Sequence, residues 1–273
     1  MLKRKMGILS VVLALCAGPL HTRADVAPAE TPAPAPAEVQ TTPPAEEKEW
    51  SVTVGFDLWS EYIFRGVDLS GNDVMLNPSL SLSWKGFTAY YWGAYNDADS
   101  GGNKWYEEAD LGVEYSHSFL DEKLTLTGGY LYYWYPDGKS GADTHELYGK
   151  ATVNVLLSPY VALYYDIDEI RGGYLSFGVS HSFDIGSKLG LPEGQSLSID
   201  PSAQLSLDLG YNSSASDSDV QFNDLLLGIK VPWQITKTLG IHAGIQFSVA
   251  MDSLNDIGQG NETIGNVGVS LSF

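Results

Sequence analysis

Cysteine, positive charge and long apolar runs are all scarce in this sequence. The single cysteine, Cys16, lies near the amino terminus, so disulfide bonds cannot stabilise the rest of the chain. Lysine and arginine total 15 against 34 aspartates and glutamates, a balance that argues against nucleic acid as a partner. Beyond residue 24 no stretch of about 18 apolar residues occurs, so no transmembrane helix is expected.

Residues 1–24 have the order of a secretory signal peptide. A basic start precedes the apolar run Ile8–Leu15, which is too short to span a bilayer, and Thr22–Ala24 suits a signal peptidase. A core helix is one alternative, and a lipoprotein signal is another, although Leu13–Cys16 has a leucine where a lipobox has a small residue. Without this segment 11 basic residues remain against 34 acidic ones, a net charge of −23.

Residues 25–48 form a second segment outside any domain. The sequence DVAPAETPAPAPAEVQTTPPAEEK is dominated by proline, alanine and glutamate and has few large apolar residues. Such a chain cannot bury enough surface to offset its conformational entropy. It is therefore predicted to be a disordered linker, extended and semi-rigid.

From Trp50 onward, apolar and polar residues alternate with a period of two. In QSLSIDPSAQLSLDLGY, residues 195–211, leucine, isoleucine and alanine share one parity while serine, aspartate and glutamine share the other. A helix would scatter these residues around its circumference, so the pattern predicts strands. We expect twelve, at residues 50–66, 74–84, 87–97, 105–118, 124–135, 144–157, 160–168, 173–183, 195–211, 220–232, 238–251 and 263–273.

The connections alternate between short turns such as Lys85-Gly86 and polar loops such as residues 97–104. This alternation predicts an all-β fold for residues 49–273, a transmembrane antiparallel up-and-down β-barrel of about 12 strands. Closure removes the exposed edges of so large a sheet. A soluble sandwich or lipocalin-like barrel also alternates. Long strands favour the membrane barrel, as do two sets of aromatic residues that suit interfacial girdles: Tyr90, Tyr91 and Trp92, and Tyr132, Trp134 and Tyr135.

Charged residues inside the apolar stretch 50–66 indicate which face is wet. Residues of like parity share a face of a strand. The charged parity set is Asp57, Glu61 and Arg65, and the apolar set is Phe56, Leu58, Tyr62 and Phe64. We expect the apolar set to face lipid, because a basic residue at the bilayer midplane costs about 2–4 kcal/mol. Arg65, set against Asp57 and Glu61, is the candidate selectivity or gating cluster.

The same parity argument gives a predicted pore lining. Its members are Asp57, Glu61, Arg65, Glu108, Asp110, Glu114, Glu146, Lys150, Asp166, Asp200, Asp208, Asp224 and Lys230, with His242 on the same face. Ten acidic residues against three lysines and arginines would attract cations. Twelve strands lie between packed eight-stranded barrels and open sixteen-stranded porins. A narrow cation-favouring pore and a filled interior therefore both stay open.

Two kinds of motif contain residues that could carry chemistry. SHSF occurs at Ser116–Phe119 and at Ser180–Phe183, but adjacent residues of a strand point to opposite faces, so the serine and histidine cannot pair simply. We expect no catalytic residues. The loop oxygens of Asp97–Asn103 and Asp217–Asp219 lack the spacing of a defined calcium loop, and the histidines lack zinc spacing. We expect no metal and no cofactor.

Two segments resemble a known family. SEYIFRGVDLSGNDVMLNPSLSLSWKGFTAYYWGAYND, with its Tyr62–Gly66 opening, and GGYLYYWYPDG, which includes Tyr135-Pro136, are similar to hallmark stretches of the TorF-type family of porin-like proteins. The resemblance covers most of residues 50–183. It implies an outer-membrane location and channel activity, and it carries over no catalytic or ligand residues.

The expected function is passive diffusion of small hydrophilic, preferentially cationic, solutes through a barrel in the bacterial outer membrane. A plugged structural or adhesive barrel is the alternative, and an outer-membrane lipid hydrolase is a weaker one. Expected partners are membrane lipid and lipopolysaccharide, and the barrel-assembly machinery, which would recognise the final strand ending at Phe273. The sequence leaves the oligomeric state open.

Overall fold

The structure, a computed structural model, describes residues 50–96, 108–136, 142–212 and 220–273. The expected signal peptide and linker lie outside these residues, as do the loop stretches Asp97–Asn103 and Asp217–Asp219. Within the described ranges, no helix is both long enough and apolar enough to cross a membrane.

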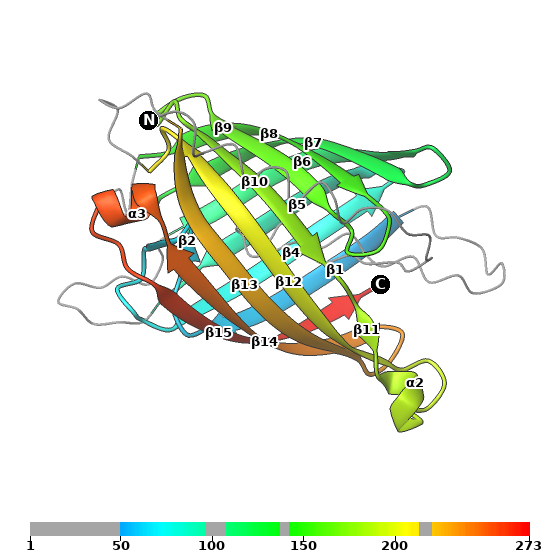
Figure 1. The fold of residues 1–273 in the computed structure, drawn as a ribbon. Helices are drawn as coiled ribbons and strands as arrows, with labels where there is room; N and C mark the ends of the chain where they lie inside the picture. Colours follow the sequence, from blue (N-terminus) through cyan, green and yellow to red (C-terminus); the bar gives the residue numbers. More distant parts are fainter. Residues whose placement is uncertain (1–49, 97–107, 137–141, 213–219) are drawn as a thin grey trace.

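Twelve antiparallel strands close into a barrel, which confirms the predicted fold class (Figure 1). They are β1 (Trp50–Trp59), β4 (Met75–Trp84), β5 (Phe87–Ala94), β6 (Glu108–Phe119), β7 (Leu124–Trp134), β8 (Thr144–Val153), β9 (Tyr160–Asp166), β10 (Gly173–Ser180), β12 (Ser196–Leu209), β13 (Gln221–Gln234), β14 (Leu239–Ala250) and β15 (Glu262–Ser272). Consecutive barrel strands pair with each other, and β1 pairs with β15 to close the sheet, so every strand has two neighbours.

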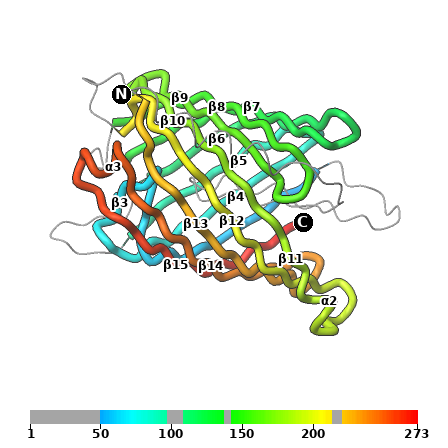
Figure 2. Tube along the Cα trace, in the orientation of Figure 1, coloured from blue at the N-terminus to red at the C-terminus, as the bar shows by residue number. Residues whose placement is uncertain are grey.

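The barrel has two different ends. At the short-turn end, β11 (Phe183–Asp184) pairs with β12, and α2 (Gly186–Leu189) follows it. At the long-loop end, α3 (Asp252–Asp256) lies between β14 and β15. Figure 2 shows α2 and α3 at opposite ends of the barrel, with the carboxyl end of β15 on the side of α2.

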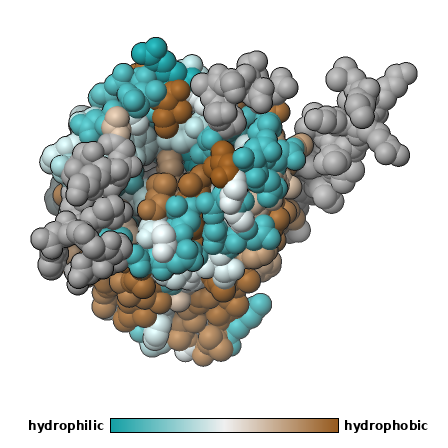
Figure 3. All heavy atoms as spheres, turned by 90° about the vertical axis from the view of Figure 1, so that its left-hand side faces the viewer, coloured by the Kyte–Doolittle hydropathy of each residue, from teal (hydrophilic) through white to brown (hydrophobic). Residues whose placement is uncertain are grey.

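The outer wall of the barrel is apolar. Alternate residues of each strand face away from the lumen, and these outward positions carry mostly apolar side chains. Phe56, Val113 and Val267 remain 49%, 54% and 54% exposed, as expected of side chains that meet lipid. Figure 3 looks onto the long-loop end, where polar residues gather, while hydrophobic residues gather on the wall behind. The predicted division between a lipid face and a wet face therefore holds for the barrel strands.

The first predicted strand is wrong beyond Trp59. The chain leaves the barrel wall at Ser60 and folds into the lumen before β4 begins. Tyr62 and Phe64, which we expected to face lipid, are each 8% exposed and belong to the interior core. Alternation alone could not reveal this, because the apolar parity continues unchanged past the point where the strand ends.

The girdle prediction is partly wrong for a related reason. Tyr90 and Trp92 point inward and belong to the interior core, and Tyr135 packs against that core. Trp134 keeps the exposed position expected of a girdle residue at the long-loop end. At the short-turn end the exposed aromatic residues include Trp50, Trp84, Phe87, Phe119 and Phe183.

Three inward-facing tyrosines lie over glycines of the neighbouring strand. The register places Tyr90 opposite Gly112, Tyr148 opposite Gly129 and Tyr160 opposite Gly178. A Cβ added to any of these glycines would come within 2.0–2.2 Å of the tyrosine ring. The glycines therefore make room for the rings, an arrangement in which aromatic side chains cover otherwise bare strand backbone.

Candidate functional site

The site begins with the loop of residues 60–74 between β1 and β4. A small hairpin, β2 (Ile63–Phe64) with β3 (Val67–Asp68), carries the Arg65-Gly66 turn into the lumen. Both turn residues have positive φ, 51° and 82°, as a two-residue type I′ turn requires. Gly66 is also fixed by packing, since a Cβ there would come within 2.3 Å of Leu254 in α3.

The remainder of the loop supports itself through Asp68. Its carboxylate accepts hydrogen bonds of 3.0 Å from the backbone N–H groups of Ser70, Gly71 and Asn72. The Ser70 hydroxyl in turn accepts the Tyr62 N–H at 2.9 Å. These local bonds hold the loop in the compact form that projects Arg65 inward.

Arg65 is the centre of the site, which we call the Arg65 hub. Its Nη2 donates to Glu146 on β8 and lies 2.9 Å from both carboxylate oxygens, and both side chains are almost wholly buried. Four aromatic rings surround the guanidinium, with centroids 4.1 Å (Tyr211), 4.8 Å (Phe64), 4.8 Å (Tyr174) and 5.1 Å (Tyr164) from Cζ. These distances fall within the range of cation–π attraction, about 6 Å.

Two asparagines hold the backbone of the turn. Asn212 and Asn223 each donate a side-chain N–H to the Arg65 carbonyl, at 3.1 Å and 2.9 Å. Ser253 of α3 donates to Asn223 at 2.7 Å, which ties this helix to the turn. A left-handed conformation costs a residue other than glycine about 1–2 kcal/mol. The hub therefore keeps an arginine in a turn position that favours asparagine or glycine.

Most of the predicted pore-lining carboxylates gather around the hub at the long-loop end. Asp166 accepts backbone N–H groups of the loop that follows it, and the Thr144 hydroxyl at 2.6 Å. Asp208 accepts the Tyr211 and Asn212 N–H groups. Tyrosine hydroxyls donate hydrogen bonds to three other carboxylates: Tyr135 to Glu108 at 3.3 Å, Tyr133 to Glu146 at 3.2 Å and Tyr174 to Asp224 at 3.1 Å.

Asp110 differs from these neighbours. It is 0% exposed, and neither of its carboxylate oxygens has a hydrogen-bond partner among the residues that the structure describes. Glu108 lies two residues earlier on the same face of β6, so a second carboxylate adds like charge. A buried carboxylate without a donor is unfavourable, and Asp110 is therefore a weak point of the acidic group.

The other predicted members lie away from the hub, and two of them, both aspartates, face a histidine or a lysine. The Asp57 Oδ1 and His242 Nε2 atoms are 2.6 Å apart, above Gly268 of the strand between them. Asp200 faces Lys230 across β12 and β13. Two more predicted members lie elsewhere on the wall: Glu114 accepts the Tyr148 hydroxyl, and the Lys150 Nζ lies 4.6 Å from the Tyr160 ring centroid.

The expected cluster of Arg65 with Asp57 and Glu61 is wrong. Arg65 pairs with Glu146, and Asp57 pairs with His242. The reason is the end of β1 at Trp59, which turns Arg65 away from the wall that carries Asp57. Glu61 lies in the loop, where burial raises its pKa and the nearby carboxylates of Glu262 and Asp68 raise it further.

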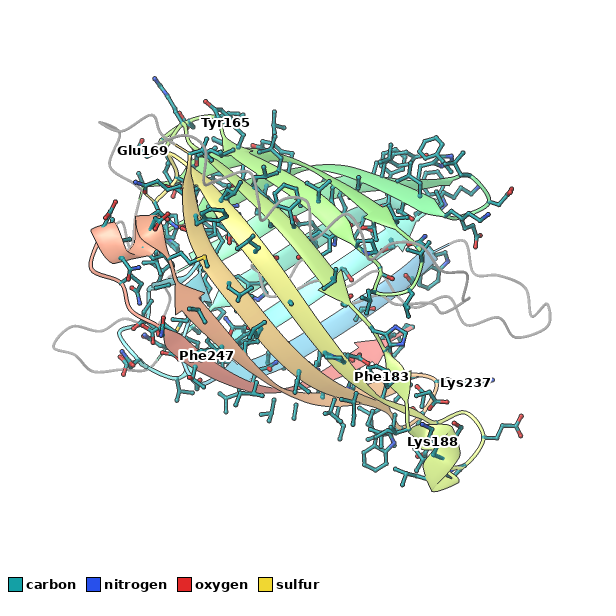
Figure 4. All side chains as sticks on the ribbon, viewed as in Figure 1. Tyr165, Glu169, Phe183, Lys188, Lys237 and Phe247 are labelled. Carbon is teal, nitrogen blue, oxygen red and sulfur yellow. The ribbon has the colours of Figure 1, made fainter. Side chains whose placement is uncertain are left out.

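Hydroxyl pairs line much of the short-turn half. Inward-facing serines and threonines meet across strands at Thr53–Ser272, Ser83–Thr88 and Ser116–Thr127, with oxygen separations of 2.8–3.1 Å. Lysines occupy the short turns, and Figure 4 labels Lys188 and Lys237 at this end and Glu169 at the other. The two halves of the lumen therefore differ in both charge and filling.

The repeated SHSF motif has a structural role in both copies. The His117 ring packs edge-on against Phe119 at 4.6 Å, and the His181 ring packs against Phe183 at 4.5 Å. The Ser116 hydroxyl bonds to Thr127 across the lumenal face. Among the residues placed by the structure, no group of three or more His, Cys, Asp or Glu side chains could hold a metal ion.

Sequence reasoning missed the aromatic and amide members of the hub. Tyr164 shares the parity of Asp166, and Tyr174 is an inward residue of β10, so parity could have placed both in the lumen. Tyr211 and Asn212 follow β12, where alternation no longer applies. Asn223 could not be assigned reliably, because the β12–β13 register shifts between Leu205 and Leu207.

Closed barrels of this kind are known from solved structures. A KdgM porin aligns with a TM-score of 0.51 at 12% identity, covering 81% of this chain and 99% of that one. A KdgM porin in complex with disordered oligogalacturonate gives 0.49 at 14% identity, covering 82% and 99%. An outer-membrane channel from Pseudomonas putida F1 gives 0.45 at 11% identity, covering 87% and 99%. The likeness to the first KdgM porin shows a shared fold, that of a transmembrane porin-type β-barrel.

The sequence itself identifies a family. Residues 44–251 match the family described as "Bacterial protein of unknown function (Gcw_chp)", and the chain belongs to that family. No curated protein matches the sequence at a significant level. The porin-type fold agrees with the resemblance noted from Tyr62–Gly66, while membership of the TorF-type family stays a prediction.

Proposed function

We propose that this protein is an outer-membrane channel through which small hydrophilic, preferentially cationic, solutes diffuse passively, with the Arg65 hub as its constriction. One observation carries the proposal: an inward-folded loop places a buried arginine among carboxylates at one end of a porin-type barrel. The other half of the lumen is lined by hydroxyls. A polar lumen with one narrow, charged level is the arrangement from which channels derive selectivity.

The sign of the lining supports a preference for cations. Ten of the thirteen residues predicted to line the pore are acidic, and Glu108, Asp110, Glu146, Asp166, Asp208 and Asp224 gather at the level of Arg65. In the part of the chain that the structure describes, Arg65 is the only lysine or arginine that is fully buried. A surplus of negative charge around a narrow passage raises the local concentration of cations.

A plugged structural barrel is the second candidate, and the burial within the hub favours it. Arg65 is 3% exposed and Glu146 0%, and Tyr62 and Phe64 fill the space beside them. If these contacts persist at all times, no solute passes the long-loop end. The two candidates therefore differ in whether the loop of residues 60–74 ever withdraws.

Conductance across a planar bilayer distinguishes them. The protein without residues 1–24 is reconstituted, and the reversal potential is measured across a potassium chloride gradient. We expect a cation-selective step, with the reversal potential moving toward zero in the triple variant Glu108→Gln, Asp110→Asn, Glu114→Gln. The control Asp121→Asn, Glu122→Gln changes two exposed turn carboxylates and should leave the reversal potential unchanged. A silent, folded, heat-modifiable barrel would instead support the plugged alternative.

The proposed location implies an assembly step. The final strand β15 carries Val267, Val269 and Leu271 on its outer face and is followed by the exposed Phe273, the pattern expected for recognition by the barrel-assembly machinery. We expect Phe273→Ser to lower the yield of heat-modifiable barrel in the outer-membrane fraction. An unchanged yield would remove this part of the proposal. Lipid and lipopolysaccharide are the expected surroundings of the apolar wall.

A further inference from the structure

The Arg65 side chain occupies a pocket that has the chemistry of a binding site for organic cations. The barrel strands supply Glu146 from β8 and the rings of Tyr164 and Tyr174, and the residues just after β12 supply the ring of Tyr211. Only one ring of the four, that of Phe64, travels with the loop. A carboxylate beside several aromatic faces is how proteins recognise guanidinium and alkylammonium groups.

We propose that this pocket, which we call the wall pocket, is a binding site for solutes with a guanidinium or alkylammonium group. In the resting barrel the Arg65 guanidinium occupies it as a tethered stand-in for such a solute. A passing cation takes the position of Arg65 when the loop of residues 60–74 withdraws. This inference rests on the proposed channel function and names the class of solute that the constriction would recognise.

The space around Arg65 requires exchange. The cavity beside it measures about 10 Å³ and is lined by residues that include Ile63, Gly66 and Tyr174. A volume of this size holds at most one water molecule. This cavity cannot hold a second guanidinium group, and the Arg65 guanidinium itself lies against Glu146 and the tyrosine rings, so occupation of the wall pocket by a solute and by Arg65 are alternatives.

The charge of the pocket favours exchange over simple opening. Glu146 is 0% exposed, and Arg65 is the cation that pairs with it. Withdrawal of Arg65 alone would leave a buried carboxylate without its counter-charge, which is strongly unfavourable. A replacement cation removes this penalty. The turn assists release, because Arg65 has the left-handed φ of 51° that arginine adopts with difficulty.

The test is rescue of an emptied pocket by a small cation. Arg65→Ala removes the tethered guanidinium, and methylguanidinium is the probe, with N-methylurea as its uncharged planar analogue. We expect methylguanidinium, at millimolar concentration, to raise the melting temperature of the folded Arg65→Ala barrel saturably. N-methylurea should not do so. Adding Glu146→Gln to the variant should weaken the effect about tenfold or more, the loss typical of one charge-assisted hydrogen bond.

Conductance of the same variants separates this inference from the proposed function. Saturable block of the Arg65→Ala channel by methylguanidinium would support both. Rescue of the melting temperature in barrels that never conduct would support the wall pocket and count against the channel. Conducting barrels without rescue would overturn the wall pocket and leave the channel standing. If Arg65→Ala does not fold, Arg65→Gln is measured in the same way, and absence of rescue in that variant overturns the inference.

Discussion

The two halves of the lumen place charge in opposite ways. At the long-loop end, carboxylates are buried around Arg65 and are held by backbone N–H groups and phenols. Away from the hub, Asp57 contacts His242 and Asp200 faces Lys230, and hydroxyl pairs line the short-turn half. The contrast teaches that one barrel wall can carry both a buried charged cluster and a lining of paired hydroxyls, depending on whether a loop folds inward.

The largest expected difference between the halves concerns a single carboxylate in each. Glu146→Gln leaves the buried Arg65 guanidinium without a counter-charge, which should lower the free energy of unfolding by about 3–5 kcal/mol. Glu114→Gln disturbs one hydrogen bond, from the Tyr148 hydroxyl, and should cost about 1 kcal/mol. Urea unfolding in lipid vesicles measures both. Equal losses of unfolding free energy would show that the Arg65–Glu146 pair stabilises the barrel no more than the Tyr148–Glu114 hydrogen bond does.

The wall itself offers a second comparison, between adjacent glycines of β7. Gly129→Ala places a Cβ about 2.2 Å from the Tyr148 ring, so the ring must move and stability should fall by about 1–3 kcal/mol. Gly128→Ala meets nothing closer than 4.0 Å and should be neutral or slightly stabilising. The same unfolding measurement applies. A matching loss in Gly128→Ala would mean that the tyrosine contact is irrelevant.

Within the acidic group, Asp110 and Asp224 should respond with opposite sign. Asp110 lacks a hydrogen-bond partner in the described ranges, so Asp110→Asn should raise the free energy of unfolding by about 1 kcal/mol. Asp224 accepts bonds from Tyr174 and Ser248, so Asp224→Asn should lower it by about the same amount. Calorimetry of both variants at neutral pH measures these changes in stability. A lower free energy of unfolding in Asp110→Asn would contradict the prediction.

The smallest expected effect is a pH dependence of the loop. Glu61 has a raised pKa in the folded loop, so the folded form holds a proton that the released loop gives up. This stabilisation is fully present below the ordinary carboxyl pKa of 4.5 and is lost as the pH rises through the raised folded value. The open probability of the proposed channel should therefore increase as the pH rises above 4.5 and through the raised pKa of Glu61.

Glu61→Gln tests the origin of that dependence. The amide does not titrate in this range, so the variant should show a flatter pH profile than the parent barrel. Glu169→Gln, at an exposed loop position, is the matched control and should leave the profile unchanged. A profile that survives Glu61→Gln would assign the titration to another group.

Parity predicted the barrel and the inward orientation of most charged residues because strand alternation is a local property. Parity assigns Glu108, Asp110 and Glu146 to the inward face, and all three side chains are buried there. The partner of Arg65 could not be predicted in this way, since Glu146 lies 81 residues further along the chain. Its position depends on the register of the six barrel strands from β1 to β8 and on a loop that leaves the wall.

The sequence after β1 contains a weak indication that the strand ends, but the continuing apolar alternation hides it. Tyr62 and Phe64 continue the apolar alternation, yet Gly66, Gly71 and Asn72 follow within a few residues and are typical of turns. The tyrosine–glycine contacts left no such signal. Each glycine is recognisable as special only when the register shows which tyrosine lies opposite, as for Gly129 and Tyr148.

The contact between Asp57 and His242 has a consequence for biosynthesis. It joins β1 to β14 above Gly268 of β15, so it exists only after β15 has been added between the two. A ribosome that stalls before β15 releases a sheet with two unpaired edges, which is prone to aggregate. A chain that lacks β15 therefore cannot form the Asp57–His242 contact and leaves β1 and β14 as exposed edge strands.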